Sequence, residues 1–157
     1  MSAVADGLST EAAMDRLDAV LDLSGIRMKL ADPEEGRGYS ETDLDLREGE
    51  YRKFLALHLA NPGMDSVPCK LVDEFWHQHI LDTRAYHDDC HAIFGEYLHH
   101  FPYFGMRGEE DARALQDAYV DTLDRYRAAF GEPPDETWIS ADASKCKRTA
   151  CKPQKCR

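Results

Sequence analysis

Apolar residues recur at intervals of three and four along most of this chain, a spacing that predicts amphipathic α-helices. The most regular case is residues 109–130, where Leu115, Tyr119 and Leu123 share one face and Gly131 ends the run. No convincing alternation of apolar and polar residues, the mark of half-buried strands, occurs. The pattern therefore predicts an all-α fold, a compact bundle of about five helices over residues 9–23, 48–60, 68–81, 83–98 and 109–130.

Turn-forming residues separate the first two helices. Ser24-Gly25 is expected to end the first helix, and the polar stretch 31–39 is expected to be a loop. Ser40 and Asp43 have the spacing of a capping box, which places a helix start ahead of the helix predicted over 48–60.

Asp82 alone separates the third predicted helix from the fourth. Aspartate is a favoured N-cap, so the two helices are expected to fold back on each other as a helical hairpin at 68–98. The next segment, HHFPYFG at 99–105, is predicted as an aromatic loop that packs onto the core. Its two adjacent histidines could bind copper or zinc, although most such pairs are solvated.

Charge divides the chain into an acidic body and a basic end. Among 157 residues there are 19 Lys and Arg against 30 Asp and Glu, a formal net charge of −11. Residues 145–157 hold six of the basic groups and no acid, which leaves −17 on residues 1–144. We expect a single helical domain over 1–140 and a flexible basic tail over 141–157. Nucleic-acid binding is not expected of an acidic body, whereas the basic tail could contact an acidic protein partner or the protein's own acidic face.

Composition also bears on the compartment. No run of about eighteen apolar residues occurs, so we expect no membrane-spanning helix. The N-terminal residues lack the basic start and apolar middle of a secretory signal, and a cytoplasmic location is expected. Five cysteines, an odd number, favour reduced thiols over a disulfide framework.

Six of the seven histidines lie between residues 72 and 105. His77 and His79 stand two apart on a predicted helix, about 200° around its axis, so they do not readily bind one ion together. In a hairpin, His77 can be held by Asp89 or His79 by the Tyr86 hydroxyl. The same geometry allows His77, Asp89 and Cys90 to converge on a metal, though less easily.

Other metal arrangements stay open. His87 and His91 have the i, i+4 spacing that lets two imidazoles bind one ion, but the glutamate of a zinc protease helix is missing. Glu74-x-x-His77 and Asp88-x-x-His91 resemble half of a di-iron bundle pattern. That pattern also needs carboxylates from two further helices, for which four are available: Glu48, Glu50, Asp117 and Asp121.

Residues 76–95, WHQHILDTRAYHDDCHAIFG, contain the pattern W-H-x-H-x-L, then a tyrosine, then D-C, then an aromatic-glycine pair. This motif resembles the core of the glycine-rich domain-containing protein-like family of plants, fungi and bacteria, over about residues 51–105. That family lacks an agreed activity, and this chain has no glycine-rich segment. The resemblance implies that a set of residues preceded by Asp73 forms one unit: Trp76, His77, His79, Tyr86, Asp89 and Cys90.

Cys146, Cys151 and Cys156 recur as C-x4-C-x4-C among lysines and arginines. The spacing is longer than the chelate loops of zinc modules. Neighbouring cations lower the pKa of a thiol, which favours a copper(I) or zinc transfer arm, a redox-sensitive tether or a target for modification. The alternative is a disordered tail whose thiols are incidental.

The leading hypothesis is a small helical protein that binds zinc or copper and serves as an accessory or partner-binding module. Its candidate ligands are His77, His79, Asp89 and Cys90, with His87 and His91 as second choices. One alternative is a metal-dependent oxidoreductase or hydrolase with an open coordination position and a cavity beside Trp76 and Tyr86. The other is a purely structural domain in which His77 and Asp89 form a buried hydrogen-bonded pair.

Overall fold

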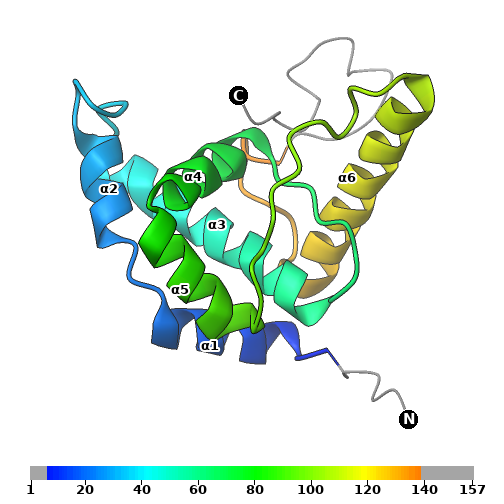
Figure 1. Ribbon diagram of the computed structural model, residues 1–157, viewed down its shortest axis with the longest axis horizontal. Coiled ribbons are helices and arrows are strands. Elements are labelled where there is room, and N and C mark those ends of the chain that lie inside the picture. The colour runs from blue at the N-terminus through cyan, green and yellow to red at the C-terminus, as the bar shows by residue number, and fades with distance from the viewer. Residues whose placement is uncertain (1–6, 139–157) are drawn as a thin grey trace.

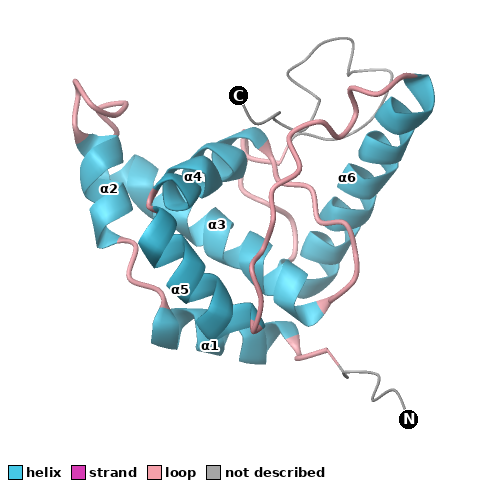
Figure 2. Cartoon of the chain, in the orientation of Figure 1, coloured by secondary structure: helices cyan, strands magenta, loops and turns pink. Residues whose placement is uncertain are grey.

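The computed structural model describes residues 7–138, and the described residues form six helices and no strand (Figures 1 and 2). The helices are α1 (Thr10–Val20), α2 (Ser24–Ala31), α3 (Glu41–Ala60), α4 (Lys70–Leu81), α5 (Thr83–Phe94) and α6 (Glu109–Phe130). The all-α prediction is confirmed. Among the described residues, no helix is long and apolar enough to cross a membrane. The tail predicted over 141–157, with its three cysteines, lies outside the described residues.

Helix α3 is the centre of the bundle, because it packs against α1, α2, α4 and α6. Aromatic contacts fix its position on α4: the Tyr51 ring lies 5.2 Å from Phe75, and Phe54 lies 5.2 Å from Trp76. All four side chains are buried. Tilted aromatic pairs of this kind stabilise beyond the area that they bury, so they hold α4 in one register on α3.

Two helix starts differ from prediction. The first helix ends at Val20, and Ser24-Gly25 opens α2, an eight-residue helix that was not predicted and whose Ile26 and Leu30 are buried. Helix α3 begins at Glu41 instead of residue 48, directly after the predicted capping box. In that box the Ser40 hydroxyl accepts from the Asp43 N–H while the Asp43 carboxylate accepts from the Ser40 N–H.

The predicted hairpin is confirmed in α4 and α5. Asp82 is at once the C-cap of α4 and the N-cap of α5, where its side chain accepts from the Ala85 N–H at 3.4 Å. Across the hairpin, Trp76 Nε1 donates to the Tyr86 hydroxyl at 2.9 Å. Helix α5 ends at Phe94, four residues before the predicted end, because Gly95 adopts a left-handed conformation with φ 74°.

The loop over 95–108 leaves the end of α5 and passes in front of α3 on its way to α6 (Figure 1). Its first half is tied to the hairpin, since the Tyr86 hydroxyl donates to the Leu98 carbonyl. The His100 ring then stacks on Trp76 at a centroid distance of 4.3 Å. The aromatic loop thus packs onto the core at this point and brings one of its two histidines beside α4.

Candidate metal centre

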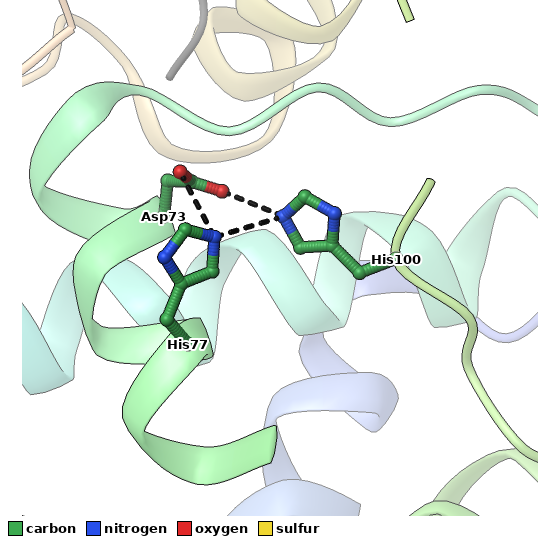
Figure 3. Close-up of side chains that lie close together, drawn as sticks. All are labelled: Asp73, His77 and His100. Atoms are coloured by element: carbon green, nitrogen blue, oxygen red, sulfur yellow. Dashed lines mark hydrogen bonds and ion pairs between the residues drawn. The ribbon is translucent and has the colours of Figure 1, made fainter. Parts of the chain in front are cut away.

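Three side chains converge beside α4 (Figure 3). Asp73 and His77 lie one helical turn apart on α4 and project from the same face, and His100 comes from the loop over 95–108. Each offers one ligand atom, and these atoms lie within 4.8 Å of one another. We call these three residues the carboxylate–histidine cluster. In the described part of the chain, no other group of three or more potential metal ligands is as close.

The separations within the cluster resemble those of ligands around one small cation. The two Nε2 atoms of His77 and His100 are 3.3 Å apart. His77 Nε2 lies 3.2 Å from Asp73 Oδ2, and His100 Nε2 lies 2.8 Å from Asp73 Oδ1. Zinc bonds of roughly 2.0–2.1 Å in a tetrahedral site place neighbouring ligand atoms about 3.3 Å apart. Two of the separations match that value, and the third is a hydrogen-bond length.

The cluster is partly buried and incompletely hydrogen-bonded: Asp73 is buried, and His77 and His100 are half-buried. The Asp73 side chain is 0% exposed, and that of His100 is 10% exposed. Asp73 Oδ2 and His100 Nδ1 are both buried and form no hydrogen bond within the described residues. A buried carboxylate is costly unless positive charge or hydrogen bonds compensate for the lost water. A cation held between the three side chains would provide that compensation.

Trp76 and Tyr86 position the histidine that comes from the loop. Trp76 contacts the His100 ring and donates to the Tyr86 hydroxyl, which in turn donates to the Leu98 carbonyl. Tyr86 is 1% exposed, and burial raises the pKa of its hydroxyl far above the ordinary value. It therefore stays protonated and keeps donating, which fixes the backbone two residues before His100.

His79 lies on a different face of α4 and belongs to a separate group. Its Nδ1 is 2.7 Å from the Tyr51 hydroxyl, and its Nε2 is 2.8 Å from Asp89 Oδ2. Burial lowers the pKa of His79, an effect that the hydrogen bond to Asp89 opposes. The Asp89 side chain accepts a hydrogen bond from the His79 Nε2–H, so Nδ1 accepts one from the Tyr51 hydroxyl. Both ring nitrogens are then engaged, which leaves no lone pair for a metal.

Cys90, His87 and His91 also lie apart from the cluster. The Cys90 thiol forms a hydrogen bond with the Tyr86 hydroxyl, and burial raises its pKa, so it remains a neutral thiol near pH 7 and a weak ligand. His87 and His91 are exposed on the outer face of α5, with ring centroids 4.5 Å apart. Their i, i+4 pairing as second-choice ligands stays a prediction.

The expected convergence of His77, His79, Asp89 and Cys90 on one point is therefore not observed in the described residues. The hairpin does bring His79 to Asp89, whereas the pair considered from the sequence was His77 with Asp89. His77 instead meets Asp73 and His100. Asp73 had a sequence signal, its position four residues before His77. His100 was noted only as one of two adjacent loop histidines that could bind copper or zinc, and nothing paired it with α4, because a stack on Trp76 from 24 residues away leaves no periodic trace.

Two of the carboxylates considered for a di-iron bundle, Glu50 and Glu74, have other partners. Glu50 is buried and accepts from the Tyr126 hydroxyl at 2.8 Å and from Trp138 Nε1 at 3.0 Å, which ties α3 to α6. Glu74 accepts from the Tyr39 hydroxyl at 2.7 Å. Neither belongs to the carboxylate–histidine cluster, so the described residues do not complete the four-helix carboxylate pattern.

A cavity of about 140 Å³ lies beside the cluster. His100, a member of the cluster, and Trp76, on which it stacks, both contribute to its wall. A cavity beside Trp76 is the feature expected of a metal site that also receives a small molecule.

Fold and site together define an all-α protein with a two-histidine, one-carboxylate cluster at a helical hairpin. Residues 24–124 match the UCP032817-like family, which covers well over half of the chain, and the chain belongs to that family. The resemblance to the glycine-rich domain-containing protein-like family is wrong, because the family match is to this other group. No curated protein and no solved structure matches the chain.

Proposed function

We propose that this protein binds a divalent transition metal, zinc above all, through Asp73, His77 and His100. One observation carries the proposal: one ligand atom each of Asp73, His77 and His100, residues from two separate segments, lie within 4.8 Å of one another, and the two imidazole Nε2 atoms are 3.3 Å apart, the separation of neighbouring ligands in a tetrahedral zinc site. The buried Asp73 Oδ2 supports it, because this oxygen forms no hydrogen bond, its near neighbour His77 Nε2 at 3.2 Å is charged only when protonated, and a bound cation would compensate it.

The ligand set favours zinc over copper(I). Copper(I) prefers thiolate and thioether ligands, whereas the cluster offers two imidazoles and one carboxylate. The two described cysteines do not supply a thiolate here. Burial raises the pKa of Cys69 to about 12, and Cys90 is a neutral thiol that is hydrogen-bonded to the Tyr86 hydroxyl. Zinc is commonly bound by this combination of nitrogen and oxygen ligands.

A second candidate function, a metal-dependent enzyme, is favoured by the adjoining cavity. Three protein ligands leave a fourth position of a tetrahedral ion open for water or substrate, which is typical of catalytic zinc and not of structural zinc. The cavity beside Trp76 and His100 would give a small substrate a place next to that ion. A hydrolytic reaction by zinc-bound water is the simplest chemistry that such a site supports.

Zinc titration of the full chain against a chromophoric chelator tests the proposal. Cys146, Cys151 and Cys156 are replaced by serine, and no histidine tag is present, so that other thiols and imidazoles do not compete. We expect one zinc per chain. His100→Gln and Asp73→Asn should each weaken binding by at least about tenfold, since even the partners of ligands typically matter that much.

His99→Gln is the matched control. His99 is the exposed neighbour of His100, so its loss should leave the zinc affinity unchanged. Equal affinities for His100→Gln and His99→Gln would contradict the proposal. Loss of binding in His87→Gln alone would assign the metal to the surface pair on α5. If no zinc binds and His77→Ala still destabilises the chain, the cluster is a hydrogen-bonded structural unit.

A further inference from the structure

A second pocket, which we call the α4 pocket, lies at the start of α4 and measures about 420 Å³. Its volume is in the range of pockets that hold small molecules. Five charged side chains contribute to its wall: Arg37, Arg47, Lys70, Glu74 and Glu136. None of them belongs to the carboxylate–histidine cluster, so a site here is separate from the proposed zinc site.

Two guanidinium groups of this pocket meet at one carboxylate. Glu74 Oε1 accepts from the Tyr39 hydroxyl at 2.7 Å and from Arg47 Nη1 at 3.2 Å. Glu74 Oε2 lies 3.6 Å from Arg37 Nε. Neither guanidinium has another carboxylate partner within the described residues. Since a guanidinium has five N–H donors, both arginines keep donors for a further acceptor.

Lys70 adds a positive charge that the protein itself does not compensate. It is exposed and lies one helical turn before Glu74, on the same face of α4. Its ammonium group forms no hydrogen bond or ion pair within the described residues. Lys70 also opens α4, and the amino end of a helix carries a partial positive charge that favours an anion.

The charges of the pocket select the charge of its ligand. Three cations against two carboxylates leave one net positive charge, on a chain whose residues 1–144 carry −17. A ligand with a single negative charge neutralises this excess. A dianion, such as a phosphate monoester, would bring a surplus negative charge beside Glu74 and Glu136, where like charges repel.

The shape of the lining groups selects a carboxylate. The two oxygens of a carboxylate match the planar fork of a guanidinium, which can bind both at once. Leu71 and Tyr39, both half-buried, also line the pocket. They give an organic group attached to the carboxylate a partly apolar surface to contact.

We propose that the α4 pocket binds a small organic monocarboxylate, whose carboxylate is held by Arg37 and Lys70 and whose organic group packs against Leu71. Arg37 is the arginine available for the ligand, because its side chain is 66% exposed. That of Arg47 is 21% exposed and lies over the Tyr39 ring, 3.9 Å from its centroid.

Three probes of similar size separate the charge of the ligand from its ring: benzoate, benzyl alcohol and phenyl phosphate. Their affinities are measured at pH 7.5, where phenyl phosphate is a dianion, by NMR titration of the full chain. The chain is first freed of zinc with a chelator, because a carboxylate also binds to an open position on zinc. Benzoate should bind at least about threefold more tightly than either other probe. It should shift the amide signals of Lys70 and Leu71.

Charge-removing variants place the carboxylate. Arg37→Gln and Lys70→Gln should each weaken benzoate binding roughly three- to tenfold, between the effect of an exposed ion pair and that of a buried charged hydrogen bond. Arg113→Gln is the matched control, because Arg113 is exposed on α6 and does not line the pocket. It should bind benzoate as wild type does. Glu136→Gln removes a like charge and should strengthen benzoate binding roughly two- to threefold.

Equal affinities for benzoate and benzyl alcohol would overturn the inference, and so would tighter binding of phenyl phosphate than of benzoate. Equal benzoate affinities for Arg37→Gln and Arg113→Gln would place the ligand elsewhere and overturn it as well. If a variant does not fold, the three probes in the wild-type chain still decide. All these measurements use the zinc-free chain, so their outcome is independent of the zinc titration of His100→Gln against His99→Gln.

Discussion

Removal of one hydroxyl, in Tyr86→Phe, should both destabilise the fold and weaken the metal site. Tyr86 is 1% exposed, and its hydroxyl accepts from Trp76 Nε1 at 2.9 Å and donates to the Leu98 carbonyl. Each hydrogen bond contributes about 0.5–1.5 kcal/mol, and a buried donor left without a partner costs about 1–3 kcal/mol. The free energy of unfolding should therefore fall by about 2–4 kcal/mol.

Urea unfolding of the zinc-free chain, followed by circular dichroism, measures this loss. Tyr103→Phe is the control, because Tyr103 lies in the same loop and is 59% exposed. An exposed substitution of this kind changes stability by less than about 0.5 kcal/mol. Zinc affinity should also fall in Tyr86→Phe and not in Tyr103→Phe. Without the Tyr86 hydroxyl, the Leu98 carbonyl loses the hydrogen bond that fixes the backbone before His100. Equal unfolding free energies for the two variants would refute the role assigned to Tyr86.

Three further outcomes are expected. Gly36→Ala should lower the free energy of unfolding by about 1–3 kcal/mol in urea titrations, because a β-carbon would overlap the backbone of α2; a loss below that range would contradict the packing described. Gly49 lies inside α3 with open space around it, so Gly49→Ala should instead raise the free energy of unfolding by about 0.5–1 kcal/mol. Burial lowers the pKa of His58 from its ordinary value of 6.5, so the unfolded chain takes up this proton at higher pH than the folded chain, and stability falls as the pH drops below 6.5. His58→Gln should reduce the difference in unfolding free energy between pH 7.5 and pH 5.5, and an unchanged difference would rule out this contribution.

The sequence predicted the helices whose apolar period and end signals agree. For α6 the predicted and observed bounds coincide, because a regular stripe ends at Gly131. Helix α2 was missed because Gly25 was interpreted as a stop. Its helix exists because Ile26 and Leu30 are buried against the bundle, a long-range effect that outweighs the local cost of one glycine.

The candidate site was predicted only where it follows from helical spacing, and the part that depends on long-range contacts was missed. Helical spacing places Asp73 beside His77, and the hairpin explains why His79 meets Asp89. The position of His100 depends on the stack with Trp76 and on the hydrogen bond from Tyr86 to Leu98, both made after the chain reverses at Gly95. Contacts of that kind depend on loop geometry and cannot be derived from the period of a helix.

The most direct test of the zinc site is the side-chain ¹⁵N NMR spectrum of the histidines during zinc titration. The account predicts that one equivalent of zinc shifts the Nε2 resonances of His77 and His100 together, while those of His79 and His99 stay in place. Zinc that shifts only His87 and His91, or that leaves every imidazole unchanged at one equivalent, would contradict it.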